Sequence, residues 1–176
     1  MPPRPTLATI GYEGANVAGF LAALTAARVE LLVDVRALAS SRRPGFAKTA
    51  LSANLKTVGI DYQHLRGLGT PADGRAAARA GKHGEMHRIF REHMRTEKAQ
   101  GDLLALEDLV QSGRRVCILC FEADPAHCHR TLVAEALAAR MPVDVRHLRP
   151  EIDDAEDDEG RDADVGGGGD ASSGRT

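Results

Sequence analysis

Apolar and polar positions alternate in blocks along the first 150 residues. Continuous apolar runs at 6–10, 31–35 and 116–121 are typical of strands that are buried on both faces of a parallel sheet. An alternating run at 60–65 and a short run at 141–148 predict two more strands. The pattern therefore predicts about five short strands.

Between these runs, apolar residues recur at helical spacing. The recurrences predict helices at 17–24, 50–58, 86–94, 103–110 and 128–137. Residues 67–84 are rich in Gly, Ala and Arg, and we expect a mobile excursion with one weak helical turn there. Strands that alternate with helices imply right-handed crossovers. The expected fold is three-layer α/β, Rossmann-like, with a mostly parallel sheet of about five strands flanked by helices.

Charge is divided unevenly along the chain. Residues 151–176 hold ten acidic and two basic side chains, whereas residues 1–150 hold 15 acidic and 21 basic ones. An acidic, Gly-rich segment cannot bury enough apolar surface to fold. We therefore expect a flexible N-terminus at 1–5, one α/β domain at 6–150, and a disordered acidic tail at 151–176. The tail is either a solubilising appendage or a shield over a basic anion site.

Composition narrows the functional classes. No apolar run is long enough to span a membrane, and three cysteines without an apolar leader favour the reducing cytoplasm. Four Phe, two Tyr and no Trp offer little surface for stacking bases, which weakens a nucleic-acid partner. Residues 11–14 are not a dinucleotide fingerprint, so we expect no redox cofactor. The oligomeric state stays open.

The richest chemistry lies between the strand at 116–121 and the helix after it, where α/β proteins bind ligands. A helix start at Cys128, beside His129 and Arg130, is expected to lower the pKa of the thiol. Cys128 is then a candidate nucleophile and His129 a proton carrier. Glu122 shares a face with Cys120 at the strand end and is a candidate general base. The alternatives are an inert, packed cysteine and a structural ion pair.

Spacing excludes two cysteine-dependent classes and argues against metal. In cysteine phosphatases and rhodaneses, an arginine follows the catalytic cysteine at a fixed spacing. Here Arg130 follows Cys128 by two positions and Cys120 by ten, and neither spacing matches. Zinc sites usually show two tight ligand pairs, and the adjacent side chains of Cys128 and His129 should diverge. We expect no metal ligand, although a metal- or redox-sensing protein built on Cys120 and Cys128 is a third hypothesis. Cys117, on the opposite strand face, is expected in the core.

A second group of polar residues follows the strand at 31–35. Asp34 and Arg36 point to the same rim as the cysteine loop, and Ser41 and Arg42 follow in a loop. Arg36, Arg42 and Arg130 each offer a planar fork of donors that suits phosphate or carboxylate. Their convergence would form an anion pocket with Asp34 and Ser41. The alternative is an Asp34–arginine ion pair that pins the loops.

Several short motifs follow one another along the chain. They are Thr9-Ile10-Gly11-Tyr12-Glu13-Gly14, Val33-Asp34-Val35-Arg36, Ser41-Arg42-x-Pro44-Gly45-Phe46, Gly59-Ile60-x-Tyr62-x-His64-Leu65, Leu68-Gly69 and Leu119-Cys120-x-Glu122-x-Asp124-Pro125-x-x-Cys128-His129-Arg130. Over residues 6–148 this set resembles the domain-of-unknown-function family 488. The resemblance implies an α/β fold and adds Tyr12, Glu13 and Tyr62 to the candidate ligand-binding residues. It implies no catalytic mechanism.

These observations lead to three hypotheses of function. The first is a cytoplasmic enzyme that binds a small anionic, phosphate-bearing ligand or nucleotide and catalyses its hydrolysis or group transfer. The second is a non-catalytic binding module for nucleotides or nucleic acid that uses the same arginines on phosphate. The third is the metal- or redox-sensing protein.

Overall fold

Five strands form one sheet in which every strand pairing is parallel. The computed structural model describes residues 3–152, so nearly all of the acidic tail expected at 151–176 lies outside the described residues. The sheet order is β3-β2-β4-β1-β5. The strands are β1 (Thr6–Gly11), β2 (Leu31–Asp34), β3 (Asp61–His64), β4 (Val116–Cys120) and β5 (Asp144–Leu148). This confirms the predicted strands and the parallel α/β class.

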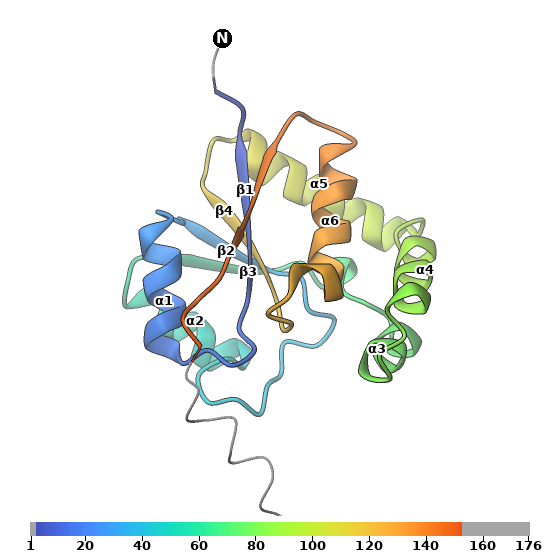
Figure 1. Ribbon diagram of the computed structural model, residues 1–176. Helices are drawn as coiled ribbons and strands as arrows, with labels where there is room; N and C mark the ends of the chain where they lie inside the picture. The colour runs from blue at the N-terminus through green and yellow to red at the C-terminus, as the bar shows by residue number, and fades with distance from the viewer. Residues whose placement is uncertain (1–2, 153–176) are drawn as a thin grey trace, which may run out of the picture.

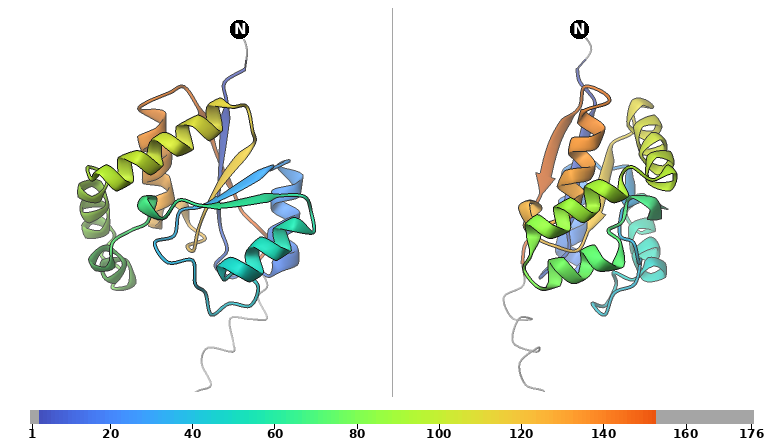
Figure 2. Two further views of the ribbon diagram at one scale, coloured as in Figure 1. Left: turned by 180° about the vertical axis from the view of Figure 1, so that it is seen from behind. Right: turned by 90° about the vertical axis from the view of Figure 1, so that its right-hand side faces the viewer.

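Helices cover both faces of the sheet, which makes three layers (Figures 1 and 2). The helices are α1 (Val17–Ala26), α2 (Lys48–Lys56), α3 (Ala72–Arg79), α4 (His83–His93), α5 (Glu97–Gln111) and α6 (His129–Ala138), with short 3-10 turns η1 (Arg66–Leu68) and η2 (Pro125–His127). Phe20 of α1 and Leu55 of α2 share one core cluster with Leu119 of β4. Phe90 of α4 and Leu106 of α5 share the other with Ile118. Successive residues of β4 thus face opposite layers, as a strand requires.

The expectation of a mobile excursion with one weak helical turn over 67–84 is wrong at residues 72–79, where the eight-residue helix α3 forms. The buried face of α3 consists of Gly74 and Ala77, which are too small to produce a periodic pattern of large apolar residues. A Cβ at Gly74 would stand 3.2 Å from Ile89, so α3 packs closely on α4. The hydrophobic pattern of the sequence therefore does not reveal α3, because the residues at its contact with α4 are small.

Helix α5 also begins earlier than expected, at Glu97. Thr96 caps it, because its hydroxyl accepts a hydrogen bond from the backbone N–H of Ala99 at 3.3 Å. The first turn buries only Ala99, so the apolar stripe becomes visible at Leu103.

The parallel topology brings several chain ends to one edge of the sheet. β2 ends at Asp34 and β4 at Cys120, and Gly11 at the end of β1 lies opposite Cys120. Helix α6 starts at this same edge (Figure 1). Side chains that are far apart in sequence therefore meet there.

Two glycines give a matched test of packing at this edge. A Cβ at Gly11 would overlap the carbonyl oxygen of Glu122 and approach Nη1 of Arg130, whereas Gly101 in α5 has open space around it. We expect Gly11→Ala to lower the free energy of unfolding by about 1–3 kcal/mol. Gly101→Ala should raise it by up to about 1 kcal/mol, because alanine favours a helix. Urea denaturation measures both, and equal effects would contradict the close approach at Gly11.

Candidate functional site

A cavity of about 600 Å³ opens at the carboxyl edge of the sheet. Three parts of the chain line it: the ends of β1 and β2, the helices α3 and α4, and the loop between β4 and α6. Its charged and reactive lining residues are Glu13, Arg36, Arg75, Arg79, His83, Cys120, Glu122, Asp124, His127 and His129. The cavity therefore lies at the place where parallel α/β sheets bind ligands.

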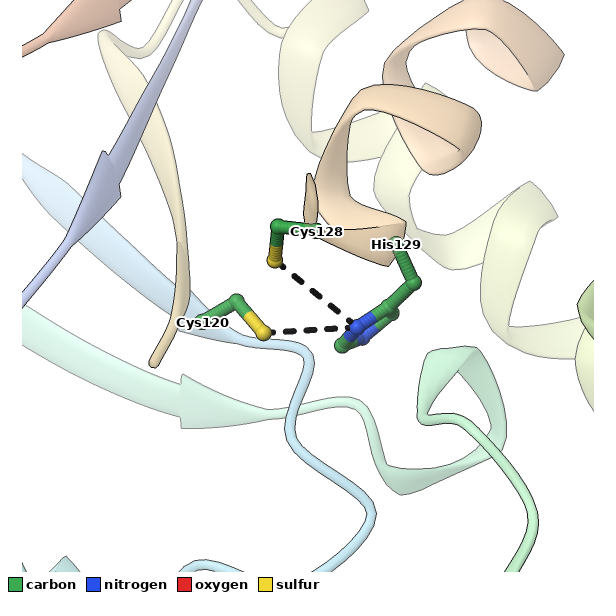
Figure 3. Close-up of side chains that lie close together, drawn as sticks. All are labelled: Cys120, Cys128 and His129. Carbon is green, nitrogen blue, oxygen red and sulfur yellow. Dashed lines mark hydrogen bonds between the residues drawn. The ribbon is translucent and has the colours of Figure 1, made fainter. Parts of the chain in front are cut away.

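Cys120 and His129 in the wall of this cavity converge with Cys128, which is buried beside them (Figure 3). Nδ1 of His129 lies 3.3 Å from Sγ of Cys120 and 3.9 Å from Sγ of Cys128. Nε2 of His129 lies 2.7 Å from the carbonyl oxygen of Val35. Because a carbonyl only accepts hydrogen bonds, Nε2 carries a proton, and in the neutral ring the lone pair of Nδ1 faces both sulfurs. Burial alone would lower the pKa of His129, but its contacts with Cys128 and Val35 outweigh burial and raise the pKa above its ordinary value.

The adjacent side chains of Cys128 and His129 do not diverge as expected. Cys128 has extended backbone angles (φ −121°, ψ 144°) and is the N-cap of α6, whereas His129 is its first residue. This change of backbone conformation between neighbours turns both side chains to the same side. The helix start predicted near Cys128 is confirmed.

The predicted low pKa of the Cys128 thiol is wrong. Burial raises the pKa of Cys128 well above its ordinary value, and burial also raises the pKa of Cys120. Sγ of Cys128 accepts from the backbone N–H of Arg130 at 3.5 Å, but this contact does not offset the loss of water. Cys120 lines the cavity, whereas Cys128 is 1% exposed and is not among the described lining residues.

Glu122 reaches this cluster from the loop after β4. Its Oε2 lies 3.2 Å from Sγ of Cys120, as their shared face at the strand end predicted. Glu122 is half-buried and lines the cavity, so its carboxylate can contact both the thiol and a ligand. Cys117 lies in the core cluster on the α1–α2 side, which confirms the expectation for the third cysteine.

Asp34 and Arg36 form a buried ion pair that pins the neighbouring loops. Arg36 contacts Asp34 through Nη2 at 2.7 Å and Nε at 2.9 Å. Its Nη1 donates to the hydroxyl of Tyr12 at 3.2 Å and to the carbonyl of Phe46 at 2.9 Å. The hydroxyl of Tyr62 donates to Oδ2 of Asp34 at 2.5 Å. The fork of Arg36 is therefore engaged by the protein itself, although the residue also borders the cavity.

These bonds keep the network in one charge state. Burial alone would lower the pKa of Arg36, but the bonds to Asp34 outweigh it and raise the pKa above its ordinary value. Burial and the bond to Asp34 raise the pKa of Tyr62. Arg36 thus stays charged and Tyr62 stays a donor at any physiological pH.

Arg36, Arg42 and Arg130 do not converge on the cavity. Arg130 is fully buried, with Nε donating to the hydroxyl of Thr9 at 3.2 Å, Nη1 to the carbonyl of Glu122, and Nη2 to the carbonyl of Ala123 at 3.2 Å. Arg42 is exposed and is not among the described residues that line the cavity. Two backbone carbonyls and the hydroxyl of Thr9 accept the hydrogen bonds of Arg130, which leaves its fork engaged within the protein.

The remaining predicted residues divide between loop and cavity. The hydroxyl of Ser41 accepts from the backbone N–H of Arg43 at 3.1 Å, which shapes the loop. Glu13 lines the cavity, and its Oε1 accepts from the backbone N–H of Ala123 at 3.1 Å. Glu13 thus helps to hold the loop that carries Glu122.

Sequence reasoning missed the cavity wall that α3 and α4 supply. Arg75 and Arg79 lie one helical turn apart on α3, and His83 begins α4. The ring of His83 stacks on that of His127 at 4.3 Å, and its buried Nδ1 has no hydrogen-bond partner within residues 3–152. The Arg75–Arg79 spacing is visible in the sequence, but nothing there shows which helix face meets the cavity.

The fold and site define a three-layer α/β protein with an all-parallel sheet and, at its carboxyl edge, a cavity that several charged side chains line. Residues 16–137 match the family "Domain of unknown function DUF488", and the chain belongs to this family. The match contains Cys120, Glu122, Cys128 and His129. No curated protein and no solved structure matches the chain. None of the helices in the described residues is long and apolar enough to cross a membrane.

Substitution of two aspartates compares the contribution of a buried ion pair with that of an exposed one. Asp34→Asn keeps the shape of the side chain but leaves the buried cation of Arg36 without a carboxylate, so we expect a loss of about 3–5 kcal/mol in unfolding free energy. Asp61 pairs with Arg114 at 2.6 Å on the surface, and Asp61→Asn should cost at most about 1 kcal/mol. Guanidinium denaturation measures the two values. A loss below about 1 kcal/mol for Asp34→Asn would contradict the anchoring role.

Proposed function

We propose that this protein binds a small anionic ligand, a phosphate-bearing molecule or nucleotide, in the cavity and catalyses its hydrolysis or transfer of a group from it. The observation that carries this proposal is the contact of Cys120 with both Glu122 and His129 in the cavity wall. The volume of about 600 Å³ suits a small molecule. Three free cysteines favour a reducing compartment, and we place the protein in the cytoplasm.

The charges of the cavity support an anionic ligand that also carries polar groups. Arg75 and Arg79 supply guanidinium groups from α3, and Nδ1 of His83 supplies a buried polar atom without a partner in the described residues. Asp124 lies in the loop between β4 and α6, and the backbone N–H of Ala126 lowers its pKa, so it is ionised at neutral pH. A nucleotide suits a cavity with both positive and negative side chains, because its phosphate can lie near the arginines and its hydroxyl or amino groups near the carboxylates.

The cluster supplies groups for acid–base chemistry. Glu122 is the general base, since its carboxylate lies in the cavity and contacts Sγ of Cys120. His129 exchanges protons through Nδ1 only, because Nε2 is held by Val35. Cys120 presents its thiol to the ligand, and Cys128 contacts His129 through Sγ without lining the cavity. We therefore propose Cys120, in place of the candidate nucleophile Cys128, as the reacting thiol, because Cys120 lines the cavity and Cys128 does not.

A non-catalytic nucleotide-binding module is the second candidate. The raised pKa values of Cys120 and Cys128 favour it, because a protonated thiol is a poor nucleophile. Both candidates use the cations of α3, but only the enzyme depends on Glu122. The two experiments below separate these candidates.

Arg79 tests the ligand site in both candidates. Loss of a charge-assisted contact in Arg79→Gln should weaken binding of AMP about 10–100-fold. Arg88→Gln is the matched control, because Arg88 lies on the surface of α4 and pairs with Glu92. Calorimetric titration of each variant with AMP and with inorganic phosphate at low salt measures the effect. Equal affinities of Arg79→Gln and Arg88→Gln for AMP would refute a ligand site at α3.

Glu122 tests the chemistry. Glu122→Gln keeps the shape of the side chain but removes the base, so kcat for a chromogenic phosphate ester should fall about 100-fold or more. KM should change little, because the cations of α3 stay in place. Steady-state kinetics of wild type and variant give both constants. If AMP binds but no ester is turned over by the wild type, the binding module replaces the enzyme.

A further inference from the structure

Cys120 and His129 in the cavity wall, together with Cys128 buried beside them, have the geometry of metal ligands. Sγ of Cys120, Sγ of Cys128 and Nδ1 of His129 all lie within 4.8 Å of one another. Zinc bonds of about 2.3 Å to sulfur and about 2.0 Å to nitrogen, at tetrahedral angles, separate S and N by about 3.5 Å. The two sulfur–nitrogen distances, 3.3 and 3.9 Å, lie on either side of that value. Small rotations of the side chains would complete the coordination.

The surroundings orient these three groups. The carbonyl of Val35 fixes the tautomer of His129, so that the lone pair of Nδ1 points at the sulfurs (Figure 3). A histidine that binds a metal almost always donates its other ring N–H to such an acceptor. The backbone N–H of Arg130 points at Sγ of Cys128 and stabilises a thiolate there. The end of β4 and the start of α6 hold the ligands on rigid elements.

We infer that Cys120, Cys128 and His129 bind one divalent transition-metal ion, Zn²⁺ by the chemistry of this ligand set. Binding replaces the protons of the two thiols, so at least two protons are released for each ion bound. The charge of Zn²⁺ is then balanced by two thiolates, which allows a neutral cluster to stay buried.

Three protein ligands leave a fourth position on the metal. Cys120 and His129 line the cavity, so that position faces it, with Glu122 beside it. Structural zinc sites use four protein ligands, whereas catalytic ones keep such an open position. If the proposed function holds with the metal bound, an anionic oxygen of the ligand or a water molecule takes this position. Glu122 then remains the base, whereas Cys120 and His129 act as metal ligands in place of the reacting thiol and the proton carrier. Metal binding itself does not depend on that function.

Metal content and spectroscopy test the site on the full chain. Protein purified with a phosphine reductant and without chelator is equilibrated with Zn²⁺, and bound metal is measured by mass spectrometry. We expect one ion per chain and release of at least two protons per ion in a weakly buffered titration. Replacement by Co²⁺ should produce thiolate-to-cobalt charge-transfer absorption and the visible bands of a tetrahedral site.

Variants locate the ligands. Cys120→Ser, Cys128→Ser and His129→Gln should each weaken Zn²⁺ binding, measured in competition with a chromogenic chelator. Loss of a residue that only hydrogen-bonds a metal ligand weakens binding about 10–100-fold, and loss of a ligand itself should weaken it further. Cys117→Ala is the control, because Cys117 is equally buried on β4 but lies in the opposite core cluster. It should bind as the wild type does.

Three results would overturn the inference. They are a wild type that holds no Zn²⁺ against the chelator, a cobalt spectrum without thiolate charge transfer, and equal affinity in Cys128→Ser, His129→Gln and the wild type. The first two use the folded wild type, so they stand even if a variant fails to fold. Binding of AMP to Arg79→Gln and to its control tests the proposed function separately, so either idea can fail without the other.

Discussion

The buried guanidinium of Arg130 holds together the edge of the sheet on which the site depends. It joins the hydroxyl of Thr9 on β1 to the carbonyls of Glu122 and Ala123 in the loop after β4. A buried cation must keep such partners, because their loss would leave it without compensation in a medium of low polarity. The path of the loop is therefore set, and Glu122 reaches the same side of the edge as Cys120. Gly11 is part of this arrangement, since no side chain fits between β1 and that loop.

A second buried arginine, Arg36, performs the same task for β2 and its loop. Its pairing with Asp34 and Tyr12 means that its charge anchors the cavity wall and offers few donors to a ligand. Two further cations line the cavity from α3: Arg79, and Arg75, whose Nη1 donates to the carbonyl of Thr70 at 2.9 Å. An arginine near a site is thus an anchor or a binding group according to the acceptors around it, and the buried carbonyls and carboxylates of this edge decide which.

Burial and reactivity oppose one another in the cysteine cluster. The thiols of Cys120 and Cys128 have raised pKa values because they are removed from water, yet they meet His129 and Glu122 in a cavity wall. A divalent cation resolves this opposition, since it stabilises both thiolates where water cannot. The inferred metal site and the proposed base therefore lie next to each other, because Glu122 contacts Cys120, one of the inferred ligands.

The sequence by itself determined the α/β class, the five strands and the start of α6 at Cys128, because buried strands and amphipathic helices leave periodic apolar patterns. It also marked the Cys120–Arg130 segment, because so many reactive groups there follow a buried strand. Only the tertiary structure decided which of these groups meet. Helix α3 packs through Gly74 and Ala77, and Cys120 meets His129 across a loop whose course depends on Arg130. Such contacts arise from packing between distant segments, and local periodicity carries no record of them.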